Sequence, residues 1–340
     1  MKHLSRRDFV RITAASAAVL AAGGLGLKEL IQASSEKTYT ETRELLGTYI
    51  TISIVDEEEG KAKAAAQDTF AEIERLSAVF SRFDATAELY RLNSSGHITG
   101  ASTELTSVLE RARSVSDMTG GAFDVTVLPL LSLITDSFEQ YNIPPDAGAI
   151  ASARALVGYK MLHIDGRDIS LEKTGMAVTL DGIAKGYITD QATALLRSRG
   201  YSRILVQAGG ELALQGMRQD GAPWKVGVTH PRALEGYYEV LQLTNACLGT
   251  SGDYENSFTA DYAYNHIIDP VSGISPAELA SATVIAADNC LADALSVAAM
   301  VMGTARSLNL FETLPNVQAL LIGKDMKSRT TSGFNAAAGV

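Results

Sequence analysis

Apolar and polar positions follow two periods along this chain, and these periods predict its helices and strands. Apolar residues recur at helical spacing in residues 58–80, 104–118 and 146–157, so we expect helices there. Residues 292–302 have almost no polar positions and predict a buried helix. Short runs rich in β-branched and apolar residues predict strands at 44–55, 161–164, 169–171, 176–180, 203–208, 211–215, 224–228, 238–243, 282–286 and 317–322.

Glycine, proline and polar residues separate these elements and predict loops. Residues 132–150 contain Pro144 and Pro145 and are expected to be irregular, and the glycines of residues 247–254 predict a turn. Gly47, inside the first strand, predicts a bulge or a close approach of another part of the chain. Strands and helices do not alternate in a βαβ rhythm. The pattern therefore favours an α+β fold, with mixed or antiparallel sheets and packed helices, in a single compact unit or in two closely packed halves. We expect the single compact unit.

The two ends of the chain are predicted to lie outside this unit. Arg6 and Arg7 stand side by side ahead of a weakly apolar run, residues 12–27, which is typical of a twin-arginine export signal. A membrane anchor is the alternative, but the run is short and poorly apolar for a span. We divide the ends into an export signal (1–33), a polar tether (34–43) and a loose C-terminal tail (323–340). We expect a periplasmic protein, which stays tethered to the membrane if the signal is not cleaved.

Charge and cysteine content narrow the possible partners. The formal net charge is −10, and so acidic a surface repels nucleic acid and anionic lipid. A phosphate site in this protein must therefore be a local pocket, and a metal ion would help to build it. Cys247 and Cys290 are the two cysteines. An exported protein permits a disulfide between them, and two buried free thiols are the alternative.

Residues 180–190, LDGIAKGYITD, are the first candidate site. A strand-like run leads through small residues into a helical pattern, so Gly182 is expected to begin a helix whose first amides lack partners. Such a helix start attracts anions, and Lys185 adds a positive charge that suits a phosphate. The alternative is an ordinary strand and helix in which the glycines permit close packing.

Three further acidic or basic residues stand in apolar surroundings. Asp124 lies between Phe123 and Val125, and Asp293 lies near the start of the apolar helix. Each is explained equally well by capping or hydrogen bonding, although a carboxylate beside small-residue carbonyls also suits Mg²⁺. His266 is able to act as a base near neutral pH or to be structural. The sequence contains no dinucleotide-binding glycine motif, Walker motif, serine-nucleophile elbow or zinc spacing.

Eight segments, taken in order, resemble one family. These are ELLGTYITI, SRFDATAELYRLN, GAFDVTVLPLL, LDGIAKGYITD, QAGGE, LGTSGDY, HIIDPVSG and LADALSVAAMVMG, and the resemblance covers roughly residues 44–322. In this order they resemble the motifs of the ApbE-type FAD:protein FMN transferases. The resemblance implies an ApbE-like α+β fold and Mg²⁺-dependent transfer of FMN from FAD to a threonine hydroxyl, with AMP leaving. It also implies a partner redox protein, secreted or membrane-bound, that carries the threonine.

The resemblance also implies roles for individual residues. The expected contacts to FAD are Leu46, Phe83, Ala122, Phe123, Asp124, Thr179 and Lys185. Mg²⁺ is expected at the Gly182 carbonyl, at Asp293 and at the start of the next helical turn, where Ser296 offers a carbonyl. His266, and with it Asp269, is expected near the reacting phosphate.

The chain departs from the family pattern at several of these positions. The acid expected at position 179 is replaced by Thr179, and an acid stands instead at Asp181, which we expect to point to the same side of the strand. There Asp181 either replaces the missing acid or reaches the metal. Val297 occupies the position of a threonine ligand, which predicts weak metal binding. Two other functions therefore stay open: an exported FAD-binding carrier without transferase activity, and a Mg²⁺-dependent FAD hydrolase that yields FMN and AMP.

Overall fold

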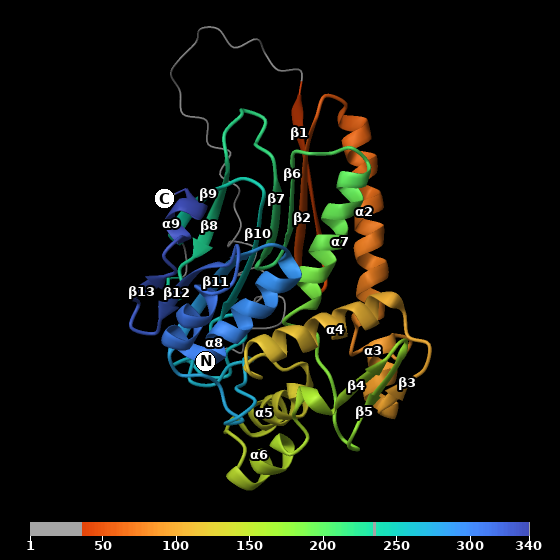
Figure 1. Cartoon of the computed structure of the whole chain (residues 1–340), viewed down its shortest axis with the longest axis vertical. Coiled ribbons are helices and arrows are strands. Elements are labelled where there is room, and N and C mark those ends of the chain that lie inside the picture. Colours follow the sequence, from red (N-terminus) through yellow and green to blue (C-terminus); the bar gives the residue numbers. More distant parts are fainter. Residues whose placement is uncertain (1–35, 234–235, 340) are drawn as a thin grey trace.

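An eight-stranded antiparallel sheet forms the centre of the computed structural model, which describes residues 36–233 and 236–339 (Figure 1). In spatial order its strands are β1 (Lys37–Leu45), β2 (Thr48–Asp56), β6 (Ile204–Ala208), β7 (Glu211–Gln215), β10 (Ala246–Gly252), β11 (Leu279–Ala286), β12 (Gln318–Gly323) and β13 (Ser328–Thr330). The predicted export signal, including Arg6 and Arg7, lies outside the described residues.

Both faces of the sheet are covered, by different layers. Helices α2 (Glu59–Phe80), α7 (Ala184–Ser198) and α8 (Asn289–Phe311) pack on one face. The β8 (Trp224–Thr229) and β9 (Tyr237–Leu243) hairpin and helix α9 (Phe334–Ala338) pack on the other.

Strand residues divide between these layers with the expected period of two. Ile50, Ile52 and Ile54 of β2 join the helical core, whereas Val55 joins the core beneath the hairpin. Helix α8 has the length and composition of a membrane span, but more than half of that stretch is buried, as in the core helix of a globular protein.

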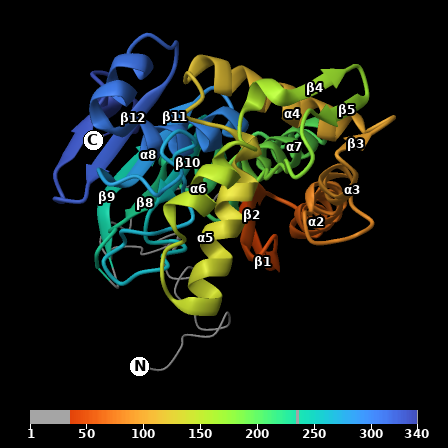
Figure 2. The same cartoon turned by 90° about the horizontal axis from the view of Figure 1, so that it is seen from below.

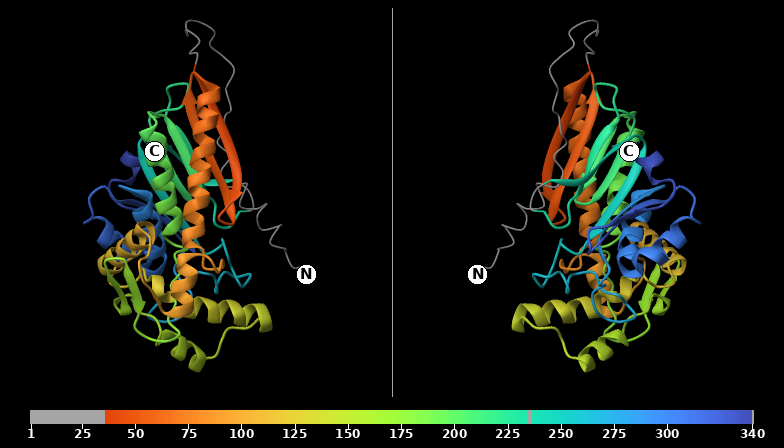
Figure 3. Two further views of the ribbon diagram at one scale, coloured as in Figure 1. Left: turned by 90° about the vertical axis from the view of Figure 1, so that its right-hand side faces the viewer. Right: turned by 90° about the vertical axis from the view of Figure 1, so that its left-hand side faces the viewer.

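A second group of elements gathers at one end of the helical layer (Figures 1 and 2). It contains α3 (Glu88–Ser95), α4 (Thr103–Met118), α5 (Leu128–Tyr141), α6 (Ala147–Arg154), two short 3-10 helices (Val125–Val127 and Tyr159–Met161), and a small sheet of β3 (His97–Ile98), β5 (Asp168–Leu171) and β4 (Leu162–Asp165). Helix α5 projects sideways from this end (Figure 3). The α+β class and the antiparallel sheet agree with the sequence prediction.

The prediction of an N-terminal tether at residues 34–43 is wrong for most of that segment. Residues 37–45 form β1, which pairs with β2 in a hairpin whose turn is made by Leu46 and Gly47, both in the left-handed region at φ 56° and 69°. The single strand with a bulge at Gly47 is therefore also wrong. The polar sequence misled the prediction because β1 is an edge strand, and hydroxyl pairs such as Thr42 with Thr51 line its exposed face.

The prediction of a loose C-terminal tail at residues 323–340 is also wrong. Residues 328–330 pair with β12, and Phe334 of α9 is 2% exposed against the core beneath the hairpin. One buried aromatic side chain thus fixes a segment that has little hydrophobic pattern of its own.

Three internal segments differ from their predicted structure. Part of the segment expected to be irregular, residues 132–141, belongs to helix α5, which ends at the left-handed Asn142 just before the two prolines. Residues 247–252 belong to β10 and are not a turn. Residues 176–180 are not paired in a sheet; Asn93 brackets Val178 with two hydrogen bonds instead.

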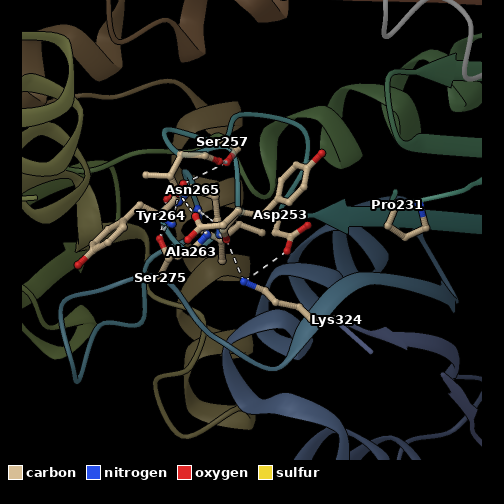
Figure 4. Close-up of polar contacts among 12 residues, drawn as sticks. Pro231, Asp253, Ser257, Ala263, Tyr264, Asn265, Ser275 and Lys324 are labelled. Atoms are coloured by element: carbon tan, nitrogen blue, oxygen red, sulfur yellow. Dashed lines mark hydrogen bonds and ion pairs between the residues drawn. The ribbon is translucent and has the colours of Figure 1, made fainter. Parts of the chain in front are cut away.

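The β10–β11 connection, residues 253–278, is fastened to the sheet by Asp253. Its carboxylate is 1% exposed and accepts two hydrogen bonds from Arg232, at 2.7 and 2.8 Å. Lys324 Nζ lies 3.5 Å from the same carboxylate and donates to the Tyr262 carbonyl at 2.9 Å (Figure 4). The buried Asn265 then exchanges hydrogen bonds with Ser275 across the connection. His266 therefore lies on a long but tightly held segment.

Replacing Asp253 with Asn should destabilise the protein by about 2–4 kcal/mol, because Arg232 and Lys324 would lose their shared counter-charge in a largely buried place. Urea unfolding of the full chain measures this change. Asp220→Asn removes a carboxylate that is 59% exposed from its pair with Arg218, and should cost no more than about 0.5 kcal/mol. Equal losses for the two variants would contradict the buried anchor.

Candidate functional site

The LDGIAKG segment forms a tight turn rather than a direct passage from strand to helix. The Leu180 carbonyl accepts hydrogen bonds from the amides of Ile183 and Ala184, and helix α7 begins at Ala184. The helix thus starts two residues later than Gly182, where the sequence predicted it. A Cβ atom at Gly182 would lie 2.9 Å from Cγ2 of Val297 and 3.5 Å from the Phe123 ring. The glycine lets three distant segments meet.

Close packing of α7 on α8 brings the next residues together. A Cβ at Gly186 would lie 2.3 Å from the Asn289 carbonyl oxygen, so only glycine fits this helix crossing. Asp190 accepts hydrogen bonds from the amides of Asn289 and Cys290 and so joins α7 to the first turn of α8. As a result Asp293, in the second turn of α8, accepts a 3.0 Å hydrogen bond from the Gly186 amide.

Lys185, Glu211 and Asp293 form a buried charge cluster at this crossing. Lys185 Nζ lies 3.2 Å from Glu211 Oε2 and 3.4 Å from the Asp181 carbonyl oxygen. Glu211 and Asp293 are each 1% exposed, and the negative charge of Asp293 helps to raise the pKa of Glu211. Two neighbouring buried carboxyl groups resist losing both of their protons.

The pKa values of these groups follow from burial and mutual charge. Burial raises the pKa of Glu211 to about 8, against the opposing effect of Lys185, and burial likewise raises the pKa of Asp293. Burial alone would lower the pKa of Lys185, but the negative charges of Asp293 and Glu211 outweigh it and raise that pKa. Burial also raises the pKa of Glu255, a further carboxyl group within reach of the Lys185 charge. Lys185 therefore stays protonated at neutral pH.

Sequence reasoning missed Glu211. Glu211 is the last residue of the QAGGE segment, but the sequence analysis assigned it no function. The available signal was an acid placed directly after two glycines, at the first position of an otherwise apolar strand. Its contact with Lys185 joins β7 to α7 and follows from the register of the sheet rather than from any local pattern.

The chemistry of this cluster fits a hard divalent cation. Glu211 Oε2 is buried and receives no hydrogen bond from the described residues, and the Asp293 carboxylate lies close by. Oxygen ligands of this kind are those that Mg²⁺ prefers. The described residues contain no ready group of three His, Cys, Asp or Glu side chains for a metal. A cation bound here would take the remaining oxygens from backbone, such as the Gly182 carbonyl, and from a ligand.

Neither Val297 nor Ser296 offers a side-chain oxygen to a cation beside Gly182. The methyl group of Val297 faces Gly182 and offers no oxygen. The Ser296 hydroxyl lies 2.7 Å from the Ser251 hydroxyl and donates to the Asp293 carbonyl, so it faces the sheet rather than Gly182. The Ser296 side chain therefore does not replace the missing threonine.

Some of the residues expected to contact FAD lie beside the same turn, and several serve the fold as well. Ala122 and Phe123 are buried, and Phe123 contacts the Gly182 turn. The Asp124 carboxylate accepts hydrogen bonds from the amide and hydroxyl of Thr126 and from the Tyr159 amide, and burial raises its pKa. The Asp124 side chain thus fixes the segment that presents Phe123.

The remaining three expected contacts differ in exposure. Thr179 is buried and its hydroxyl accepts a hydrogen bond from the Asp181 amide at 3.2 Å. Leu46 is partly buried at the tip of the β1–β2 hairpin. Phe83 is 77% exposed, which leaves most of its ring surface open.

Asp181 does not share the environment of Thr179, so the expectation that both side chains point to the same side is wrong. Its side chain is 57% exposed and pairs with Arg82 Nη2 at 3.2 Å, whereas Thr179 is buried. The alternation of a strand ends at this point because residues 180–183 form a turn.

His266 and Asp269 lie on the β10–β11 connection. The His266 amide donates to the Asn256 carbonyl, while ring atom Nδ1 is buried without a hydrogen-bond partner among the described residues. Burial and the positive charge of Lys185 lower the pKa of His266 to about 4, so its ring is neutral at neutral pH. The Asp269 carboxylate accepts hydrogen bonds from the amides of Val271 and Ser272 and thereby shapes the following turn.

Cys247 and Cys290 are both free thiols, as one of the two sequence alternatives expected. Burial raises the pKa of Cys247 to about 12, so neither metal binding nor thiolate chemistry is favoured there.

Curated proteins similar in sequence to this chain carry the name FAD:protein FMN transferase. A sequence model of the ApbE family matches residues 46–321. The chain is 31% identical over 271 residues to the FAD:protein FMN transferase of Vibrio cholerae, covering 77% of this chain and 81% of that protein. It is 26% identical over 319 residues to the Treponema pallidum protein of the same name, covering 88% of each.

Solved structures give the same result. The flavin transferase ApbE of Vibrio cholerae superposes with a TM-score of 0.78 at 27% identity, covering 89% of this chain and 99% of that one. The ApbE protein of Thermotoga maritima gives a TM-score of 0.81 at 28% identity, with the same coverage. The resemblance drawn from the eight motifs is confirmed, and this chain belongs to the ApbE family.

Proposed function

We propose that this chain transfers the FMN part of FAD to a protein acceptor and releases AMP. The observation that carries the proposal is the buried Lys185, Glu211 and Asp293 cluster beneath the LDGIAKG turn. It combines a permanent positive charge, suited to a pyrophosphate, with carboxylate oxygens suited to a cation. The relatives named FAD:protein FMN transferase support the same activity.

The reaction we propose is a phosphoryl transfer to a threonine hydroxyl. The hydroxyl oxygen forms a bond to the phosphorus of the FMN half, the bond from that phosphorus to the bridging oxygen breaks, and AMP leaves with that oxygen. Lys185 holds the charged pyrophosphate, and the neutral His266 takes the hydroxyl proton. Mg²⁺, held by the Asp293 carboxylate and the Gly182 carbonyl, would neutralise charge on the phosphate oxygens.

The acceptor and the location of the reaction belong to the same proposal. We infer that the acceptor is a secreted or membrane-bound redox protein and that the enzyme works in the periplasm. The paired Arg6 and Arg7 ahead of a weakly apolar run support export by the twin-arginine route. The net charge of −10 argues against a nucleic acid partner.

A second candidate is an FAD-binding carrier without transferase activity. It is favoured by Val297, because a methyl group faces Gly182 where a ligand oxygen would help to hold the metal. The FAD hydrolase differs only in that water takes the place of the threonine hydroxyl.

These functions are distinguished by incubating the full chain with FAD, Mg²⁺ and an acceptor subunit that has not yet received its covalent FMN. The mass of the acceptor and the amounts of AMP and free FMN are then measured. The transferase predicts one added FMN mass on the subunit and an equal amount of AMP. AMP and free FMN without any acceptor would instead identify the hydrolase. Bound FAD with no AMP would identify the carrier and contradict the proposal.

His266→Ala should lower kcat by about 10²- to 10⁴-fold, because the base would be lost. His163→Ala, which changes an exposed histidine, should leave kcat unchanged. Since the pKa of His266 is about 4, the native ring is neutral and able to accept a proton from about pH 6 to pH 8. The part of the kcat/KM profile that depends on His266 should fall only as the pH approaches 4, and a falling limb near pH 6.5 that disappears in His266→Ala would contradict this assignment.

Val297→Thr should tighten Mg²⁺ binding by about tenfold, because it places a hydroxyl oxygen beside the Gly182 turn. Calorimetric titration of Mg²⁺ into the protein with FAD present measures the affinity. Val301→Thr makes the same change one helical turn further along α8 and serves as the control. If both variants bind Mg²⁺ as the native chain does, the metal does not lie at Asp293.

A further inference from the structure

An unbroken series of contacts joins an exposed aromatic ring to the buried charge cluster. The Arg82 guanidinium carbon lies 4.2 Å from the centre of the Phe83 ring, and Arg82 Nη2 lies 3.2 Å from Asp181 Oδ2. The Asp181 carbonyl oxygen is 3.4 Å from Lys185 Nζ, which contacts Glu211. Phe83 is thus connected to the phosphate-binding turn by two residues that have no role in the function proposed above.

The arrangement of Arg82 is not explained by stability alone. Its Nε atom is buried and has no hydrogen-bond partner among the described residues, which costs about 1–3 kcal/mol. Its ion pair joins a side chain 25% exposed to one 57% exposed, and such pairs contribute little. What the arrangement does achieve is to fix the guanidinium between an aromatic face and the turn.

The Phe83 ring has the geometry of a stacking surface. The guanidinium covers one face of the ring, and the side chain is nevertheless 77% exposed, so the opposite face is open to a planar ligand. Without a restraint, an exposed aromatic residue on the loop between α2 and α3 would lose rotational freedom each time a ligand ring stacked on it. A ring fixed in advance avoids that loss.

We propose that Arg82 and Asp181 form a latch that holds Phe83 as a preformed stacking surface for an aromatic ring of the dinucleotide. This inference rests on the proposed function, because the dinucleotide is taken to be FAD. Arg82 and Asp181 are positioning residues that act through Phe83. The latch also gives Asp181 a role other than metal binding, since its carboxylate is directed to Arg82.

Titration of FAD against the full chain, followed by flavin fluorescence in the presence of Mg²⁺ and without acceptor, tests the latch. Arg82→Gln and Asp181→Asn should each raise the Kd for FAD about three- to fivefold. Phe83→Ala should raise it about tenfold. Arg199→Gln breaks an exposed ion pair with Asp68 at the far end of α7 and should leave the Kd unchanged.

Two combined variants distinguish a latch from direct contact with the ligand. In the Phe83→Ala background, Arg82→Gln should have no further effect on the Kd for FAD, because the latch would have nothing to hold. In the same background, Asp181→Asn should likewise have no further effect, because Asp181 acts only through Arg82 and the Phe83 ring. Full additivity of either change with Phe83→Ala would overturn the latch and indicate that Arg82 or Asp181 touches the ligand itself.

The outcomes also separate this inference from the proposed function. If the native chain does not bind FAD, both are contradicted. If the native chain binds FAD and the single variants at Arg82 and Asp181 bind it equally well, only the latch is contradicted.

Discussion

The charge cluster of the half-buried Lys185 with the buried Glu211 and Asp293 is the interaction on which the rest of the site depends. Taking a carboxylate out of water costs several kcal/mol, and only attraction to an opposite charge and good hydrogen bonds offset that cost. The three residues come from α7, β7 and α8, so the cluster exists only while helices and sheet keep their relative positions. A cluster of this kind is a weak source of stability but a suitable place for a charged ligand.

Small residues make this positioning possible. Gly186 lets α7 approach the backbone of α8 closely. Gly249 lets β10 approach the same helix, because a Cβ at Gly249 would lie 2.5 Å from the amide nitrogen of Asp293. Asp190 then ties the first turn of α8 to α7 through backbone amides. Around this rigid centre, the segment of His266 is held by Asp253, Arg232 and Lys324. Fixed groups on several elements surround one turn, which is the preorganisation that phosphoryl transfer requires.

The sequence predicted the fold class, and it singled out several residues that the structure brings together, because the motifs stand in a specific order. It placed Gly182 and Lys185 on the right turn and marked Asp293 as an unusual acid. It did not assign Glu211, because the contact between β7 and α7 depends on strand register and not on local sequence. The environment of Asp181 was mispredicted because alternation along a strand was extended into a turn. Residues 37–43 were predicted to be a tether and residues 328–338 part of a loose tail, because edge strands and a short helix held by one phenylalanine carry little hydrophobic pattern.

The central claim is that the turn at Gly182 and the buried Lys185, Glu211 and Asp293 cluster together bind the FAD pyrophosphate and its metal. Anomalous diffraction from crystals grown with FAD and Mn²⁺ in place of Mg²⁺ tests it most directly. The account predicts one manganese peak within bonding distance of the Asp293 carboxylate and the Gly182 carbonyl, with the pyrophosphate beside Lys185. A peak away from Asp293, or a flavin bound elsewhere on the protein, would contradict it.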